Sequence, residues 1–211
     1  MLAVVGGHSR NIGKTSVVAG IVRALPEFRW TAVKITQYGH GKCADEGDDC
    51  ACSGGDLHPY MLDEETAPNK HDSGRFLAAG AERAFWLRTA QGQLGNGIGP
   101  LKAVLAQAVN SILESNSVLQ FLRPDIYIVV LDPSVSDMKD STRRYFDRAD
   151  AFAIVDRPGA PMPWDGIPQR WLKGKPRFSI APPGYSAAGL ADLVRAAGNR
   201  TIASNTPSSD R

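Results

Sequence analysis

The sequence predicts an α/β fold, in which helices cover both faces of a mostly parallel β-sheet. Two observations lead to this prediction. The chain contains short apolar runs that suit buried strands, and it contains longer segments whose apolar residues recur at helical spacing. The two kinds of segment alternate along the chain. Such alternation is typical of parallel strands joined by helices, because a parallel pair needs a connection that crosses back over the sheet. The length of 211 residues suits one domain, which we assign to residues 1–198.

The charges of the chain nearly cancel. There are 24 lysines and arginines against 22 aspartates and glutamates, so the formal net charge is +2. This balance favours neither a nucleic acid nor an anionic membrane as a partner. No apolar run reaches the length of a transmembrane helix, and the chain starts with a strand and a loop rather than a basic signal sequence. We therefore expect a cytoplasmic protein.

A phosphate-binding loop is predicted at the start of the chain. The apolar run Leu2–Val5 indicates a buried strand, Gly6–Gly13 a loop, and Lys14–Leu25 an amphipathic helix. In such a unit the backbone N–H groups of the loop converge on phosphate oxygens, and the helix N-terminus adds a partial positive charge. The side chain of Lys14 would reach the β- and γ-phosphates, and the Thr15 hydroxyl would ligate Mg²⁺. The residues expected at the nucleotide are Gly7, Asn11, Ile12, Gly13, Lys14, Thr15 and Ser16.

The spacing of this loop departs from the usual pattern. That pattern has a glycine where this sequence has His8, so Gly7 opens a longer loop of the form Gly-x5-Gly-Lys-Thr. Gly-Lys-Thr also occurs at the capped start of an ordinary helix, which is the alternative interpretation. The preceding strand and the following helix favour nucleotide binding and hence a P-loop NTPase fold.

The elements up to residue 109 follow from composition and periodicity. Trp30–Thr36 is an apolar run and indicates the second strand. Residues 37–70 lack periodicity and are rich in Gly, Asp, Glu and Cys, which indicates a long loop inserted in the domain. Asp72 or Ser73 can cap a helix that carries Phe76 on its apolar face. A strand over Ala84–Thr89, a glycine-rich turn over Gln91–Pro100 and a helix over Leu101–Val109 are then expected.

The second half of the chain contains one ambiguous segment. In residues 110–122 the helix could run on, or a short strand could end at Glu114. Asp125–Asp132 indicates a strand buried on both faces. The remaining elements expected are a charged helix over Asp137–Asp150, a strand over Ala151–Asp156, a proline-rich loop to Gln169, a strand over Arg177–Ala181 and a helix over Ala187–Ala197. Residues 199–211 are polar, and we expect them to be disordered.

Several charged residues are further candidates for the nucleotide site. Lys34 lies near the carboxyl end of the second strand, where open α/β sheets bind ligands, so it either faces the phosphates or is a solvated edge-strand lysine. Asp72 and Arg75 lie near a helix N-terminus, where they would meet Mg²⁺ and a phosphate or serve as a cap and a surface arginine. Either Glu114 or Asp132 could be the acidic group opposite the Mg²⁺.

The three cysteines lie close together in the long loop. Cys43, Cys50 and Cys52, with His58 nearby, offer four ligands for a tetrahedral zinc site. The spacing differs from that of a standard zinc knuckle, but a loop of low apolar content would gain order from a bound ion. Free thiols are the alternative.

With these residues in view, the chain resembles the SIMIBI branch of P-loop NTPases, and in it the MobB-type molybdopterin-guanine dinucleotide biosynthesis proteins. Dethiobiotin synthetases and cobyrinic acid a,c-diamide synthases are a more distant likeness. The resemblance rests on Gly7-x5-Gly13-Lys14-Thr15, on Lys34 and on the run Asp72–Ala81. It implies that Glu114 ends a strand and holds Mg²⁺ together with Asp72, although Ser115 replaces the usual glycine.

The same resemblance places Asp156 and Pro182 at the nucleotide base. It also implies a homodimer with nucleotide sites near the interface. The base itself is left open between GTP and ATP, because the guanine-specifying Asn-Lys-x-Asp motif is absent.

Three functions are consistent with these residues. The first is an accessory protein of molybdenum cofactor biosynthesis that binds GTP or ATP with Mg²⁺ and acts with a partner protein. It would hydrolyse the nucleotide slowly, with Lys14, Lys34 and the ion neutralising the phosphates. The second is an ATP-dependent ligase similar to dethiobiotin synthetase. The third is a metal-binding protein in which the nucleotide gates the Cys/His site.

Overall fold

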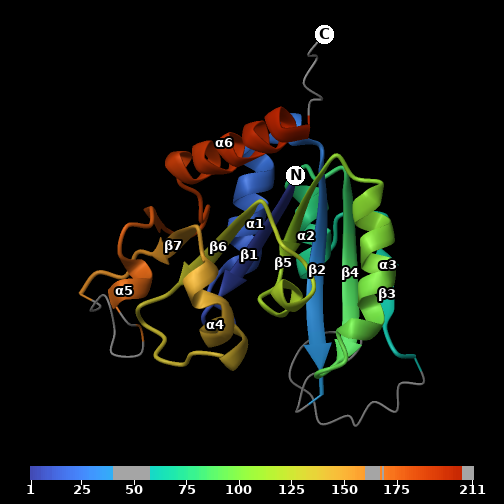
Figure 1. Cartoon of the computed structure of the whole chain (residues 1–211), viewed down its shortest axis with the longest axis horizontal. Helices are drawn as coiled ribbons and strands as arrows, with labels where there is room; N and C mark the ends of the chain where they lie inside the picture. Colours follow the sequence, from blue (N-terminus) through green and yellow to red (C-terminus); the bar gives the residue numbers. More distant parts are fainter. Residues whose placement is uncertain (40–57, 160–166, 168, 206–211) are drawn as a thin grey trace.

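One eight-stranded sheet organises the protein, whose computed structural model describes residues 1–39, 58–159, 167 and 169–205 (Figure 1). The strand order is β3–β4–β2–β5–β1–β6–β7–β8. All neighbouring strands are parallel except β3, which runs antiparallel to β4. The strands are β1 (Leu2–Gly7), β2 (Trp30–Tyr38), β3 (Met61–Glu64), β4 (Arg83–Ala90), β5 (Asn110–Glu114), β6 (Ile126–Leu131), β7 (Ala151–Val155) and β8 (Arg177–Ile180). The α/β fold predicted from the sequence is therefore confirmed.

Helices pack on both faces of the sheet and enclose two apolar cores. Helices α1 (Lys14–Ala24), α2 (Asp72–Ala78) and α6 (Ala188–Asn205) share one core with the sheet. Helices α3 (Gly95–Ala106), α4 (Asp140–Tyr145) and α5 (Gln169–Leu172) share the other. Alternate residues of a strand face opposite sides, so along β6 Ile126, Ile128 and Val130 face the first core and Tyr127, Val129 and Leu131 the second. None of the helices in the described part of the chain is long and apolar enough to cross a bilayer.

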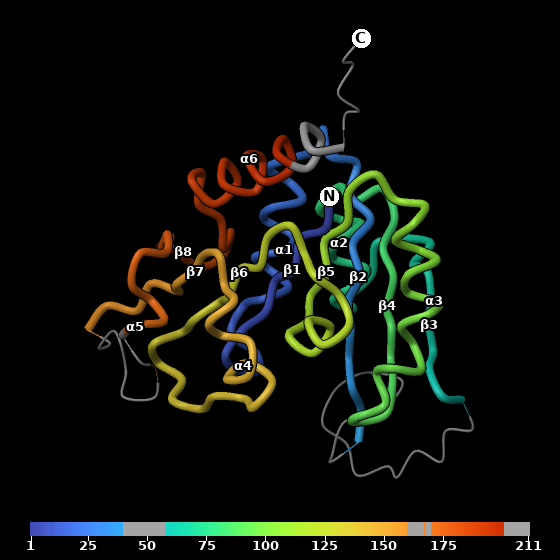
Figure 2. Tube along the Cα trace, viewed as in Figure 1, coloured from blue at the N-terminus to red at the C-terminus, as the bar shows by residue number. Residues whose placement is uncertain are grey.

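The carboxyl ends of the parallel strands define the functional edge of the sheet. In Figure 1 the arrowhead of β2 points to the lower edge, near which α4 lies. The trace in Figure 2 shows the N-terminus and α6 at the opposite end. In open sheets of this kind, ligands bind beyond the carboxyl ends of the strands.

A strand lies where the sequence predicts only loop. β2 continues to Tyr38, and β3 pairs with β4 within the segment assigned to the inserted loop. The acidic residues of β3 explain the difference. Glu64 accepts from Nε of Arg83 at 2.7 Å, and Asp63 pairs with Arg88. Carboxylates that suggest a solvated loop thus pair with arginines of the adjacent strand.

Two helices have other boundaries than the sequence predicts. α3 already begins at Gly95, inside the predicted turn, because the helix packs closely on β4: a Cβ atom at Gly97 would lie 2.8 Å from Cδ1 of Leu87. α6 likewise continues to Asn205, beyond the predicted end of the domain. At Gly198 a Cβ atom would lie 2.7 Å from Cε1 of Phe28. Both glycines permit close packing within a helix rather than ending it. In the predicted tail of residues 199–211, residues 199–205 belong to α6.

The charged segment after β6 is less helical than predicted. Only Asp140–Tyr145 forms α4, and a 3₁₀ turn over Phe146–Arg148 follows. The residues before α4 instead form an extended connection that runs past the loop after β1, and this connection contributes to the site described below.

Candidate functional site

The loop between β1 and α1 has the backbone that a phosphate cradle requires. β1 ends at Gly7, and Gly13 precedes α1 with φ of 90°, a left-handed conformation that strongly favours glycine. A Cβ atom at Gly13 would also lie 2.4 Å from Cε1 of Tyr185. Both the backbone angle and the close contact therefore require glycine directly before Lys14.

The amine of Lys14 folds back over this loop. Its Nζ donates to the backbone carbonyl of Ser9 at 2.7 Å. Burial lowers the pKa of Lys14 to about 8; the carboxylate of Glu114 opposes this shift and the charge of Lys34 adds to it. A buried amine with a lowered pKa gains from an anionic ligand, because the anion stabilises its charged form.

Three predicted metal-side residues meet at the start of α1. The Thr15 hydroxyl donates to Oε2 of Glu114 at 2.7 Å. Nζ of Lys34 donates to Oε1 of Glu114 and to Oδ2 of Asp72, both at 2.6 Å, and lies 3.3 Å from Oγ1 of Thr15. The pairing of β2 with β5 aligns Lys34 with Glu114 and brings these residues together. The resulting set of a hydroxyl and two carboxylates is of the kind that holds Mg²⁺ beside phosphate oxygens.

Lys34 is not the solvated edge-strand lysine of the second interpretation, because β2 is an inner strand of the sheet. Its amine lies at the start of α1, between Glu114 and Asp72. Burial lowers its pKa, but the charges of Glu114 and Asp72 outweigh burial and raise the pKa above its usual value. Burial would raise the pKa of Asp72, yet the charge of Lys34 lowers it. Lys34 and Asp72 are therefore both charged at neutral pH.

Arg75 links α2 to the first turn of α1. Its Nη2 donates to Oγ of Ser16 at 2.9 Å, and its Nη1 lies 3.3 Å from Oδ1 of Asp72. The helix itself is capped differently from the prediction. His71 is the N-cap, without a side-chain hydrogen bond, and Asp72 is the first helical residue. The carboxylate of Asp72 instead turns to Lys34.

The structure separates the two candidate acids. Whereas Glu114 contacts Thr15, Asp132 forms an ion pair with Nη2 of Arg157 at 2.7 Å and accepts from Oγ of Ser134 at 2.6 Å. Burial opposes ionisation of Asp132, but the hydrogen bonds from Arg157 and Ser134 prevail and lower its pKa to about 2. Glu114 is therefore the acid at the start of α1, as the motif resemblance implied.

No family model matches the sequence, and no curated protein does. Among solved structures, the chain is similar to HypB from Helicobacter pylori, crystallised in complex with nickel. The TM-score is 0.53 at 14% identity, over 94% of this chain and 87% of that one. It is also similar to LpxK from Aquifex aeolicus, described as an apo form in complex with ATP, with a TM-score of 0.44 at 17% identity over 84% of this chain and 53% of that one. The fold is that of the P-loop NTPases.

Within this fold, the longer P-loop has a structural explanation in His8. The side chain is fully buried, and its Nε2 lies 3.0 Å from the carbonyl oxygen of Val135. Burial lowers the pKa of His8, although the carbonyls of Val135 and Val130 oppose the shift. The residue that replaces the usual glycine thus anchors the P-loop to the connection between β6 and α4.

The same connection brings a lysine that the sequence analysis did not identify. The backbone N–H of Lys139 donates to the carbonyl of His8 at 2.9 Å, and Oγ of Ser9 donates to Oδ2 of Asp137 at 2.7 Å. Burial lowers the pKa of Lys139 to about 7, and the charges of Lys14, Arg10 and Lys34 lower it further. No local pattern distinguishes Lys139 from the surrounding charged residues, so only the fold reveals it as a P-loop cation.

A buried polar network holds the first residue of the P-loop. Asn116 accepts from the N–H of Gly7 at 2.9 Å and donates to its carbonyl at 2.8 Å. Thr142 donates to the same carbonyl at 2.8 Å, and the hydroxyl of Tyr127 donates to Oδ1 of Asn116 at 3.1 Å. Asn116 and Thr142 lie in polar stretches that give no local signal, and only Tyr127 stands out, as a polar group in an apolar strand. The sequence analysis missed them.

The predicted base-side residues lie at the same edge of the sheet. Asp156 follows β7 and is exposed, and its N–H donates to the carbonyl of Ile180 at 2.8 Å. Pro182 follows β8, and the loop that contains it places Tyr185 against Gly13. Asp156 and Pro182 thus follow the ends of two adjacent strands. Tyr185, in the same loop as Pro182, lies against Gly13 of the P-loop.

The predicted zinc site lies mostly outside the described residues. Cys43, Cys50 and Cys52 fall in residues 40–57, and His58 is exposed. In the residues that the structure describes, no group of three or more His, Cys, Asp or Glu side chains could hold a metal ion.

Proposed function

We propose that this protein binds a purine nucleoside triphosphate with Mg²⁺ and hydrolyses it slowly. The observation that carries the proposal is the convergence of Lys14, Thr15, Glu114 and Lys34 at the start of α1. The Lys34 amine, the Thr15 hydroxyl and the buried carboxylate of Glu114 are hydrogen-bonded to one another there, and the Lys14 amine lies on the adjacent loop at the carbonyl of Ser9. Such a set suits the triphosphate and its metal ion better than it suits a helix cap.

Each residue has a defined part in this proposal. Backbone N–H groups from Asn11 to Ser16 would surround the β-phosphate, and Lys14 would leave the carbonyl of Ser9 to contact the β- and γ-phosphates. Lys139 would add a further positive charge from the opposite side of the loop. Arg75 would stay on Ser16 and contact an outer phosphate oxygen.

A magnesium ion would be held by Thr15, Glu114 and Asp72. The residues fit it, since they supply oxygen ligands from a hydroxyl and two carboxylates beside the P-loop. The bound ion would neutralise charge on the phosphate oxygens. Slow hydrolysis is expected because His8, a candidate base near the loop, is buried with its ring nitrogens directed at two backbone carbonyls.

The wider role that we propose is that of an accessory protein in molybdenum cofactor biosynthesis, acting with a partner protein in the cytoplasm. It is supported by the MobB-type motifs around Gly7, Lys34 and Asp72. A homodimer belongs to the same proposal, as does a zinc site formed by Cys43, Cys50, Cys52 and His58. Metal analysis of the protein and its Cys50→Ser variant, purified after growth with zinc, tests the zinc site: one equivalent of zinc that the variant lacks supports it.

Calorimetric titration with MgATP and MgGTP tests the nucleotide proposal. Lys14→Ala should weaken binding of the preferred nucleotide by about ten- to hundredfold, as expected for the loss of a hydrogen bond from a charged group to a phosphate. Lys102→Ala, on the exposed side of α3, is the matched control and should leave the affinity unchanged. Glu114→Gln should raise the Mg²⁺ concentration needed for binding. Equal affinity in the Lys14 and Lys102 variants would disprove the proposal.

A further inference from the structure

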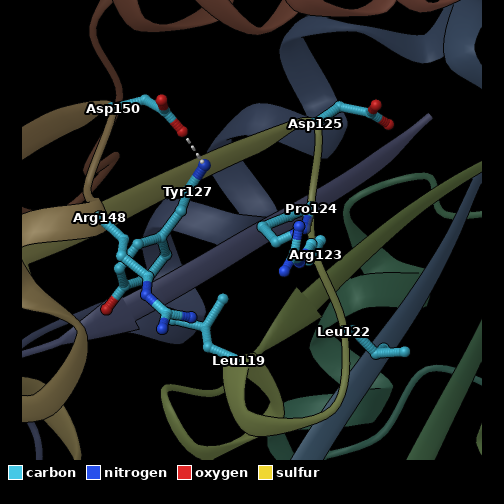
Figure 3. Close-up of a pocket in the computed structure, with 8 residues that line it drawn as sticks. All are labelled: Leu119, Leu122, Arg123, Pro124, Asp125, Tyr127, Arg148 and Asp150. Carbon is cyan, nitrogen blue, oxygen red and sulfur yellow. Dashed lines mark hydrogen bonds between the residues drawn. The ribbon is translucent and has the colours of Figure 1, made fainter.

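A cavity of about 420 Å³ lies at the edge of the sheet opposite the P-loop. It is formed by the turn before β6, by the start of β6 and by the segment between α4 and β7. Figure 3 shows the lining side chains, which are Leu119, Leu122, Arg123, Pro124, Asp125, Tyr127, Arg148 and Asp150. The volume lies in the range of small-molecule sites, and the proposed nucleotide role uses none of these residues directly.

Two arginines and two aspartates line the cavity, and the arginines are left unpaired in the described part of the chain. Within the described residues, neither Arg123 nor Arg148 forms an ion pair or hydrogen bond, and Arg148 lies 5.0 Å above the ring of Tyr145. Both arginine side chains line the cavity and are exposed to solvent (Figure 3). Arginine stays protonated at any physiological pH, so both charges persist.

The two aspartates that line the cavity are each held by a backbone amide and not by either arginine. Oδ2 of Asp125 accepts from the N–H of Leu2 at 2.6 Å, and Oδ2 of Asp150 accepts from the N–H of Tyr127 at 2.7 Å. Figure 3 shows the carboxylate of Asp125 turned away from both guanidinium groups. Neither carboxylate pairs with an arginine in the described structure, so both guanidinium groups are available to an anionic ligand.

The remaining wall is apolar. Leu122 and Pro124 are partly exposed, whereas Leu119 and Tyr127 are buried and contribute little surface. The hydroxyl of Tyr127 donates its hydrogen bond to Asn116, so this residue presents no polar donor to the cavity. This wall would bury an apolar group of moderate size.

We propose that this cavity binds an organic carboxylate with a flat apolar body, at a site separate from the nucleotide site. The apolar body would pack against Leu122 and Pro124. The carboxylate would accept hydrogen bonds from Arg123 and Arg148, since the planar guanidinium group matches a carboxylate in shape and charge.

Protein-observed NMR with 2-naphthoate as the probe tests the proposal. Saturable shifts are expected at the Nε–Hε groups of both arginines and at the backbone N–H of Tyr127. The neutral analogue 2-naphthamide should bind at least tenfold more weakly. If the amide binds equally well, or if the naphthoate shifts map to the P-loop, the proposal is wrong.

Variants separate the two halves of the recognition. The double variant Arg123→Gln/Arg148→Gln should lose at least tenfold in naphthoate affinity, whereas Arg23→Gln on the exposed side of α1 should not. Unchanged backbone shifts elsewhere establish that the double variant is folded.

Inorganic phosphate is the competing probe. Shifts at the same arginines with phosphate but not with naphthoate would overturn the carboxylate assignment. MgATP affinity of the double variant should stay unchanged, so the outcome is independent of the nucleotide proposal.

Discussion

Nucleotide affinity should fall as the pH rises from 7 to 8, because the proposed phosphate site contains two amines with lowered pKa values. These are about 7 for Lys139 and about 8 for Lys14 in the free protein. A bound triphosphate stabilises both ammonium groups, so an amine that is neutral in the free protein takes up a proton on binding. The outermost phosphate has lost its last proton near pH 6, so its own charge is constant in this window.

The size of the effect follows from the fraction of each amine that is neutral. Between pH 7 and 8 the affinity falls about 5.5-fold through Lys139 and about 1.8-fold through Lys14, or about tenfold together. Lys139→Met removes the larger factor and should leave a fall of only about twofold. The exposed control Lys102→Met should retain the tenfold fall.

Calorimetry in two buffers of different ionisation enthalpy measures the protons directly. At pH 7.5 the wild type should take up about one proton per nucleotide, and Lys139→Met only about a quarter of a proton. The reasoning is refuted if the wild-type affinity changes less than twofold, or if Lys139→Met keeps the full pH dependence. Either result would mean that the amine of Lys139 does not approach the phosphates.

Three further changes test the surroundings of the site. Asn116→Asp removes two buried hydrogen bonds without changing shape, and it should lower the free energy of unfolding by about 1–3 kcal/mol in denaturant titration; an unchanged midpoint would contradict the role of the network. Gly13→Ala should abolish nucleotide binding in calorimetry, and adding Tyr185→Ala should not restore it, because the left-handed backbone remains unfavourable after the steric clash is gone. The lowered pKa of Asp132 stabilises the fold above pH 4, and this contribution is lost as the pH falls through about 2. Arg157→Ala should therefore lower stability at pH 6 but have little effect near pH 2, and curves that stay parallel at all pH values would contradict the pairing.

The residues that act together within one stretch of sequence were predictable. The strand, the loop and the helix around Lys14 form a contiguous unit, so hydrophobic periodicity and the order of glycine, lysine and threonine locate it. The same local signals located most strands, since apolar runs in a parallel sheet are buried on both faces. They failed at Gly97 and Gly198, where a missing side chain serves packing and not a turn.

The residues that meet from distant segments depended on the tertiary structure. Glu114 and Asp132 both follow apolar runs, and only the strand order places Glu114 beside β2 and in contact with Thr15. Asn116 and Lys139 have no local signature at all, since their partners lie in the P-loop more than a hundred residues away. The sequence by itself therefore determined the fold class and the phosphate-binding motif, because both arise from short-range patterns. Only the tertiary structure decided which acid, which additional lysine and which buried amide complete the site, because strand order and register juxtapose groups that no local spacing relates.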